Sequence, residues 1–350
     1  GAALGLVVLH GVILGAVAAQ PDARGARPLP PVTPRAALPT SAARAADPSA
    51  TLDLPGHFQI TTWTTAQGLP GNWIECILQT RDGYLWLGTP EGLVRFDGMR
   101  FVLLNHANCP AFKSDVVKAL AEDIEGRLWV ATKSGGVLRL GTDGVQLIST
   151  AEGLPSDTIN ALCPRPAGGM WVATIAGLTL WEAHGLRHFS DPRLPKPGVV
   201  AVLEDLESQV WLGMQGCLQT LSVGDGSFRM VWREAAGDLH AQPAPERIFR
   251  GRRGDVWFGV DGRIARLRDG QGEEFSVQLA STDRRTKNFL EDRDGRLWAV
   301  TGNSVHLWAN GQFTPMDRAL GAEDTLVNCM LEDAQGNFWI GSRHGGLTRL

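Results

Sequence analysis

The sequence has few features of a nucleic-acid-binding or disulfide-rich protein. Its formal net charge is −4 and it contains no run of basic residues, which argues against nucleic acid as the main partner. The five cysteines are an odd number and form no Cys-x-x-Cys pair, so a disulfide framework or a cysteine metal site is weakly indicated. We expect these cysteines to be small, buried apolar thiols.

Motifs of catalytic and cofactor-binding sites are also missing. The eight histidines show no His-Glu-x-x-His spacing, and neither a Gly-x-Ser-x-Gly elbow nor a Walker-type loop occurs. The sequence therefore predicts no catalytic residue, no metal site and no cofactor within its 350 residues.

Only one long apolar run occurs, at residues 2–19, and His10 is its one polar side chain. The small residues Ala16, Ala18 and Ala19 resemble the end of a secretory signal peptide. A run of this length is also the lower limit for a membrane-spanning anchor. Both interpretations stay open for residues 1–19, and each places the rest of the chain outside the cytoplasm.

Residues 20–55 lack periodicity and large apolar side chains, and are rich in Ala, Pro, Arg, Ser and Thr. Such a segment cannot bury enough surface to offset the entropy lost on ordering, so we predict a disordered linker. The chain starts without Met and ends at Leu350 within a repeat pattern. We therefore expect it to be a piece of a longer protein.

The sequence does contain a repeat of about 42 residues centred on tryptophan. Seven of the twelve tryptophans lie at one repeat position, spaced by 43, 42, 40, 46, 41 and 41 residues. These seven are Trp86, Trp129, Trp171, Trp211, Trp257, Trp298 and Trp339. A scattered set of unrelated tryptophans does not produce such spacing.

Each repeat unit has four short runs typical of β-strands, which in the first unit are residues 73–79, 84–87, 93–96 and 100–103. Turns such as Asp97-Gly98 favour tight hairpins, because such turns need positive φ. Seven units of four strands predict an all-β fold, a seven-bladed β-propeller over residues 56–350. We expect the repeated tryptophan to fill the contact between neighbouring blades.

The seventh unit lacks a fourth strand at its C-terminal end. Residues 57–63 resemble the start of the fourth strand of the sixth unit, Gly311-Gln312-Phe313-Thr314. We therefore predict that this N-terminal strand pairs with residues 346–350 and closes the ring, which would protect otherwise open strand edges.

The units resemble the two-component regulator propeller repeat. Gly68-Leu69-Pro70 with residues 82–89 and 92–96 is close to the full pattern, and residues 153–155 and 336–342 repeat parts of it. The resemblance covers residues 56–350 and is weakest in units four and five. It implies a periplasmic ligand-sensing domain of a bacterial membrane signalling protein that forms a homodimer. The same resemblance implies a histidine kinase or diguanylate cyclase as output, although no such motif occurs in these residues.

Four acid pairs lie at one repeat position, six to seven residues before a repeat tryptophan: Glu122-Asp123, Glu204-Asp205, Glu291-Asp292 and Glu332-Asp333. A catalytic pair of carboxylates is rarely built several times over. We expect these residues to begin hairpin turns through side-chain-to-backbone hydrogen bonds.

Ligand contacts are expected from the loops that enter each blade and from the loops between second and third strands, which share one face. The candidates at these positions are Asn72, Trp73, Glu91, Lys133, Ser134, Asp157, Gln215, Asp261, Asn303, Arg343 and His344. An aromatic side chain among amides and carboxylates suits an oligosaccharide or another small polar molecule. Ordinary solvated loop residues are the alternative interpretation of each candidate.

Two other functions stay open for a propeller of this kind. Similar repeats occur in streptogramin lyases, and an enzyme of that type would need a compact group of His and Glu side chains on one face. A scaffold that binds only proteins is the second alternative.

Overall fold

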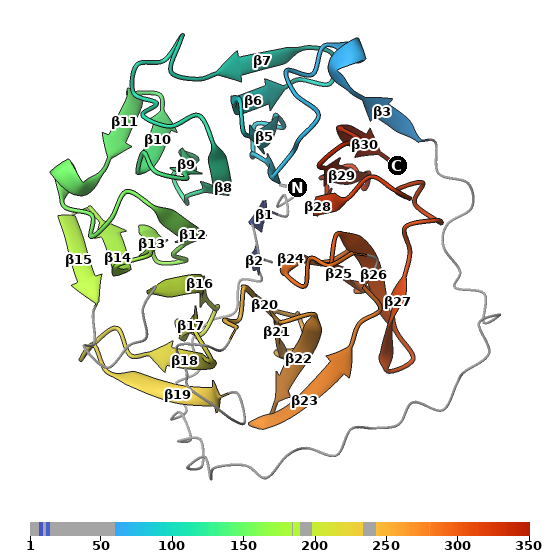
Figure 1. The fold of residues 1–350 in the computed structure, drawn as a ribbon. Coiled ribbons are helices and arrows are strands. Elements are labelled where there is room, and N and C mark those ends of the chain that lie inside the picture. The colour runs from blue at the N-terminus through green and yellow to red at the C-terminus, as the bar shows by residue number, and fades with distance from the viewer. Residues whose placement is uncertain are drawn as a thin grey trace, which may run out of the picture.

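The chain winds into a closed ring of β-sheets around a central opening (Figure 1). The structure, a computed structural model, describes residues 7–9, 12–14, 60–183, 185–189, 198–233, 243–279 and 281–350. Within these residues, seven four-stranded antiparallel sheets form the blades. Two single turns of 3-10 helix, η1 (Thr65–Gln67) and η2 (Thr150–Glu152), are the only helical elements described. The predicted seven-bladed β-propeller is confirmed.

The blades are numbered along the chain, and each runs from an inner first strand to an outer fourth strand. The first strands are β4 (Cys76–Gln79), β8 (Val117–Glu122), β12 (Ile159–Pro164), β16 (Val199–Glu204), β20 (Arg247–Arg250), β24 (Thr286–Glu291) and β28 (Val327–Glu332). The second strands are β5 (Leu85–Thr89), β9 (Leu128–Thr132), β13 (Met170–Thr174), β17 (Val210–Met214), β21 (Val256–Val260), β25 (Leu297–Thr301) and β29 (Phe338–Ser342). The third strands are β6 (Gly92–Phe96), β10 (Val137–Gly141), β14 (Gly177–Glu182), β18 (Cys217–Leu221), β22 (Arg263–Arg268), β26 (Ser304–Ala309) and β30 (Leu347–Arg349). The fourth strands are β7 (Phe101–Leu104), β11 (Gly144–Ile148), β15 (Gly185–Phe189), β19 (Phe228–Arg233), β23 (Gln271–Ser276), β27 (Gln312–Pro315) and β3 (Thr61–Trp63).

The seventh blade is built from both ends of the propeller. Its fourth strand is β3, which pairs antiparallel with β30 (Figure 1). The Trp63 ring stacks on Trp339 of the same blade at 5.6 Å and meets Phe96 of the first blade edge-on at 5.3 Å. The predicted strand began at residue 57, and residues 57–59 lie outside the described residues. The pairing of residues 61–63 therefore ties the start of the propeller to its last blade.

The repeat tryptophans lie between blades, as predicted. Trp129, Trp171 and Trp298 are among the largest fully buried side chains. Trp129 of the second blade meets Trp181 of the third at 5.9 Å, and Trp298 of the sixth meets Phe338 of the seventh at 5.5 Å. A blade that cannot bury both faces alone is stabilised by such contacts with its neighbours.

The segment before the propeller is described only in part. Strands β1 (Val7–Leu9) and β2 (Val12–Leu14) pair with each other and are drawn within the central opening (Figure 1). The rest of the predicted signal peptide or anchor at 1–19, and the whole predicted linker at 20–55, lie outside the described residues and stay predictions. In the described part of the chain, no helix has the length and apolar character needed to span a bilayer.

Candidate functional site

Successive connections in an antiparallel blade lie at opposite ends of its strands. The connections between blades and the turns from second to third strand, such as residues 105–116 and 133–136, share one face, which we call the loop face. The turns from first to second and from third to fourth strand, such as residues 123–127 and 142–143, share the other, the turn face. All the candidate ligand contacts from the sequence lie on the loop face.

The acid pairs lie on the turn face and have structural contacts. Asp123 accepts hydrogen bonds from the backbone N–H groups of Glu125 and Arg127, at 3.0 and 2.9 Å, and from Trp129 Nε1 at 2.8 Å. Glu122 accepts from the backbone N–H of Arg81 in the preceding blade, at 3.1 Å. The predicted turn-forming role is confirmed, and the glutamate also joins neighbouring blades.

The loop-face ends of the seven first strands carry a ring of mostly polar side chains. Each member stands eleven residues before a repeat tryptophan, as Glu75 does before Trp86. The members are Glu75, Lys118, Asn160, Val200, Glu246, Lys287 and Asn328, and we call them the axial ring.

Backbone irregularities explain why polar residues occur inside these apolar strands. In five blades the ring member is the residue left unpaired by a β-bulge, namely Lys118, Asn160, Val200, Lys287 and Asn328. In the first and fifth blades, Glu75 and Glu246 stand just before the strand and donate their N–H groups to Gly88 and Gly259, at 2.8 and 3.0 Å. A bulge re-aims the side chain of its extra residue. The side chains of the ring members are therefore not bound to the inward–outward alternation along the strand that buries their neighbours.

Members of the axial ring connect neighbouring blades. Lys118 forms an ion pair with Glu75 of the preceding blade. Lys287 donates to Asn328 Oδ1 of the following blade at 2.7 Å, and Asn328 Nδ2 donates to the carbonyl of Ile74 at 2.9 Å. Glu246 accepts from the backbone N–H of Thr286 at 2.8 Å. A group bound on this ring would contact several blades at once.

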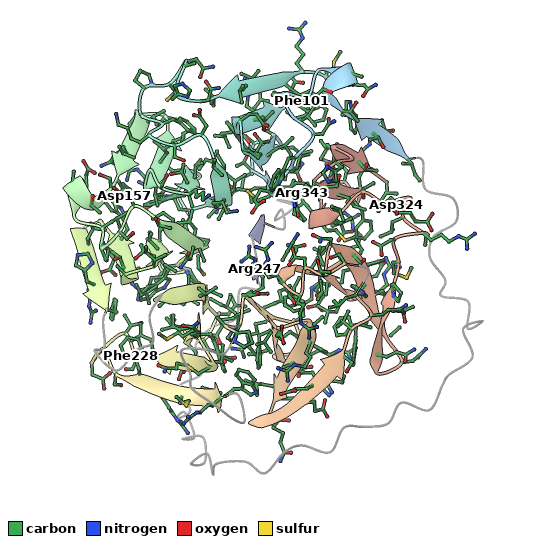
Figure 2. The ribbon with its side chains drawn as sticks, in the orientation of Figure 1. Phe101, Asp157, Phe228, Arg247, Asp324 and Arg343 are labelled. Carbon is green, nitrogen blue, oxygen red and sulfur yellow. The ribbon has the colours of Figure 1, made fainter. Side chains whose placement is uncertain are left out.

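An aromatic and a cationic side chain lie beside the ring between the seventh and first blades. Trp73 Nε1 donates to Glu75 Oε2 at 3.1 Å. The guanidinium of Arg343, from the turn after β29, lies 4.2 Å from the centroid of the Trp73 ring, within the range of a cation–π contact. Figure 2 labels Arg343 and Arg247 beside the central opening. Arg343, Trp73, Glu75 and Lys118 thus form a continuous chain of contacts over three blades, which we call the axial cluster.

The electrostatics of the ring differ from member to member. Burial would raise the pKa of Glu75, but the Lys118 charge and the hydrogen bonds from Lys118 and Trp73 outweigh it, so this pKa is lowered. Burial raises the pKa of Glu246 to about 7. Burial lowers the pKa of Lys287, against the opposing charge of Asp283. The ring therefore offers carboxyl, amine and amide groups that can bind a polar ligand.

The structure brings three of the predicted contacts together at the axis. Trp73 and Arg343 belong to the axial cluster, and Asn303 accepts from Lys287 of the axial ring. Asn303 Nδ2 also donates to Ser281 at 2.8 Å. These three residues are the predicted candidates that contact the axial ring or the axial cluster.

The other predicted candidates are spread over the loop face. Asn72 and Asp157 accept from the backbone N–H groups of Thr65 and Thr150, at 2.9 and 2.7 Å, and so hold η1 and η2. Asp261 accepts from Arg284 at 2.6 Å. Among the described residues, five remaining candidates make no side-chain contact with the axial ring: Glu91, Lys133, Ser134, Gln215 and His344.

The sequence prediction missed Glu75, Lys118, Arg247, Lys287 and Asn328. The signal of the four ring members among them was present, because every ring member has the same offset from its tryptophan. Arg247 is not a ring member and has a different signal, since it pairs with Gly259 at a position where the first blade has Cys76 and the second Ala119. Its guanidinium donates to the carbonyls of Lys287 and Glu246, at 2.8 and 2.9 Å.

Metal ligands and cysteine thiols are the other groups that could take part in chemistry. They contain no group of three or more His, Cys, Asp and Glu side chains placed to hold a metal ion. Cys76, Cys163, Cys217 and Cys329 are buried free thiols and Cys109 is half-buried, which agrees with the buried thiols predicted. Burial raises the pKa of the Cys163 thiol to about 12, so a reactive thiolate is disfavoured there.

The fold and its repeats define the chain as a seven-bladed β-propeller. The family model for the two component regulator propeller matches residues 68–91, 111–134 and 321–344. The chain therefore carries repeats of the two-component regulator propeller family, as its sequence predicted. A search of the curated proteins gives no match.

Solved structures share the fold at low sequence identity. The extracellular domain of the hybrid two component system BT3049 from B. thetaiotaomicron has a TM-score of 0.68 and 19% identity, over 83% of this chain and 41% of that one. The extracellular domain of BT4673, described as a one component system of the same organism, has a TM-score of 0.69 and 17% identity, over 84% and 40%. The chain thus spans about two fifths of these two proteins' structures.

An enzyme shares the fold as well. A catalytically inactive His-to-Ala variant of virginiamycin B lyase from Staphylococcus aureus, with quinupristin, has a TM-score of 0.65 and 13% identity. The match covers 84% of this chain and 99% of the lyase. At such identities the likeness concerns the fold alone.

Proposed function

We propose that this propeller is the extracytoplasmic ligand-sensing domain of a bacterial membrane signal-transduction protein. The family repeats support this proposal, as do the two extracellular domains of signalling proteins with the same fold. The output domain, a histidine kinase or a diguanylate cyclase, would lie in a part of the protein beyond this chain. A homodimeric receptor would carry the signal across the membrane.

The observation that carries the proposal is the axial cluster. Its four side chains come from the seventh, first and second blades and contact one another in sequence. Arg343 is exposed and Glu75 and Lys118 are partly exposed, so the cluster can be reached from the loop face. A ligand that replaces some of these contacts would alter how three blades are held together, which is a physical route from binding to a change at a dimer interface.

The chemistry of the axial cluster suits an oligosaccharide or a related polar molecule. Trp73 offers an aromatic side chain. The axial ring offers a carboxylate, lysine side chains and amide groups, and Arg343 beside it offers a guanidinium group. Sugars present hydroxyl groups that both donate and accept hydrogen bonds, and such groups match a site of mixed donors and acceptors.

Thermal denaturation of the purified protein against a panel of oligosaccharides tests the proposal, followed by calorimetric titration of any stabilising sugar. We expect Arg343→Ala and Lys118→Met each to weaken binding by about tenfold, the effect of losing one good polar contact. Arg187→Ala is the matched control, because Arg187 lies 4.7 Å from the Phe189 ring on an outer strand. This control should bind as the unchanged protein does.

Other results would point to the alternative functions. Turnover of a saccharide or of a cyclic peptide antibiotic would indicate an enzyme. Binding that is unchanged in both cluster variants would exclude the axial cluster as the sensing site. Failure of every small ligand, together with a protein partner that binds the loop face, would favour a scaffold.

A further inference from the structure

One of the seven repeat tryptophans lacks the hydrogen bond that the other six make. Trp129, Trp211, Trp298 and Trp339 donate Nε1 to the aspartate six residues earlier, at 2.8 to 3.0 Å. Trp86 donates to Thr80 at 3.0 Å, and Trp171 donates to Glu204 of the next blade. Within the described residues, no hydrogen bond joins Trp257 Nε1 to an acceptor; the residue as a whole is 4% exposed, and Nε1 is not among the buried unpaired atoms, so this nitrogen is accessible from outside.

The cause is a glycine. Gly251 stands six residues before Trp257, where four other blades have aspartate. Its φ is not in the positive range, and a Cβ added there would meet no atom closer than 3.4 Å. Neither the backbone nor crowding therefore requires glycine at this position. Its effect is to leave empty the space that an aspartate carboxylate fills in four other blades.

A cleft lies where that carboxylate is missing. It has a volume of about 350 Å³ and opens on the turn face between the fifth and sixth blades. Its lining includes Gly251 and the indoles of Trp257 and Trp308. This volume is within the range of small-molecule sites. A second cavity, lined by Asn160 and Arg247, has a volume of only about 10 Å³.

The cleft is rich in arginine. Five arginines and two carboxylates, those of Asp255 and Glu291, line it; the arginines are Arg252, Arg253, Arg266, Arg268 and Arg296. Arg266 also pairs with Glu273, and Arg296 with Asp292 and Asp294. Asp255 accepts from Arg268 Nε at 2.7 Å, and Glu291 accepts from the backbone N–H of Arg252 at 2.7 Å. Arg253 is exposed, and among the described residues its side chain has no ion pair. The guanidinium of Arg253 is therefore the donor that can bind an added anion.

We propose that this cleft binds a small organic carboxylate, whose carboxylate group takes the place of the missing aspartate beside Trp257. Such a group would accept the indole N–H of Trp257, as Asp292 does from Trp298 Nε1 in the next blade. Its second donor would be a guanidinium N–H of Arg253, because the position that Arg296 holds beside Asp292 is Asp255 in this blade. Carboxylate geometry matches a guanidinium well. The cleft is on the face opposite to the axial cluster, so it can be tested without reference to the sensing site.

Acetate is the probe closest to the missing aspartate side chain, and glucuronate is a larger one that the cleft can hold. In a ¹⁵N-correlated NMR spectrum, with the Trp257 indole resonance assigned by Trp257→Phe, we expect both to shift this resonance saturably. Sodium chloride at equal ionic strength and neutral glucose should leave it in place. Gly251→Asp should abolish the response, because its carboxylate then occupies the position beside the Trp257 indole that the ligand carboxylate would take, while Gly251→Ala should keep it.

Arg253→Ala provides a second variant that leaves the blade contacts intact, and it should weaken carboxylate binding by about tenfold. The proposal is overturned if neither acetate nor glucuronate shifts the Trp257 resonance, or if chloride shifts it equally. A response that persists in a folded Gly251→Asp variant also overturns it. The proposal is also overturned if only an acidic peptide shifts the Trp257 resonance saturably, because the cleft would then be a protein-docking site.

Discussion

Asp292 accepts a hydrogen bond of 2.8 Å from the indole nitrogen of Trp298, six residues further along the chain. Asp333 and Trp339 repeat the same bond at 2.8 Å. The aspartate begins the turn after a first strand, and the tryptophan fills the contact with the next blade. One side chain therefore couples the local turn to the packing between blades.

Replacing Asp292 should destabilise the propeller markedly. Its carboxylate is fully buried and also accepts from the backbone N–H groups of Asp294 and Arg296 and from Arg296 Nε. Asp292→Ala leaves these donors without an acceptor, so we expect a loss of about 3 kcal/mol in the free energy of unfolding. Chemical denaturation measures the change.

Asp294→Ala is the matched control for that substitution. Asp294 pairs with the same Arg296 at 2.8 Å, but its side chain is 63% exposed. Exposed ion pairs contribute little, so the control should lose less than about 1 kcal/mol. If the two variants lost equal amounts of unfolding free energy, the buried hydrogen bonds of Asp292 would not be the cause of the larger effect predicted for it.

Glu246 should make the stability of the protein fall as pH rises. Burial raises its pKa from 4.5 to about 7, and the Asp283 charge adds to this, while the Thr286 N–H, Arg247 and Arg285 oppose it. Between these two pH values the folded protein holds a proton that the unfolded chain has lost. The folded state is therefore favoured at the acid end of the window and loses that advantage toward pH 7.

Glu246→Gln removes this titration and keeps an oxygen for the Thr286 N–H. Below pH 4.5 the free energy of unfolding should change with pH equally in the variant and in the unchanged protein. By pH 8 the free energy of unfolding of the variant should exceed that of the unchanged protein by about 1–3 kcal/mol. Denaturant melts at several pH values measure the difference. Glu323→Gln, at an exposed position, is the control; a gain of the same size there would contradict the assignment to Glu246.

The closing strand should be essential for a cooperative ring. Trp63 contacts Trp339 and Phe96, and the Arg349 guanidinium lies 5.6 Å from its ring centroid. Trp63→Ala should therefore lower the free energy of unfolding by about 3 kcal/mol. Thr62→Ala, at an exposed position of the same strand, should lower it by less than about 1 kcal/mol. Deletion of residues 56–63 should leave an open, aggregation-prone ring. A deletion variant that melts as high and as cooperatively as the intact protein would refute this prediction.

Much of the fold could be predicted from the sequence because a propeller repeats local signals. The spacing of Trp86 and its six counterparts counts the blades, and each Asp-Gly or Glu-Asp turn marks a hairpin whose geometry depends on nearby residues. The segment that pairs with β30 was visible as well, since Trp63 and its neighbours resemble a fourth strand. These features follow from short-range chemistry repeated in register.

The candidate site was predicted only in part. Trp73, Asn303 and Arg343 were chosen because they lie in loops, and loops were expected to carry the site. Glu75, Lys118 and Lys287 were missed because a single polar residue in an apolar run reads as an ordinary strand position. The bulges that separate such residues from the regular pairing are properties of the backbone in the folded sheet.

The sequence by itself determined the number of blades, the position of each hairpin turn and the absence of aspartate at Gly251. Only the tertiary structure decided that Arg343 lies on Trp73, since these residues are 270 positions apart and meet only when the ring closes. It also decided that the missing aspartate leaves a cleft lined by arginines, because Arg266 and Arg268 reach that space from β22 and Arg296 from the turn before β25. Periodicity along the chain specifies the blades, whereas contacts between blades depend on the closed ring.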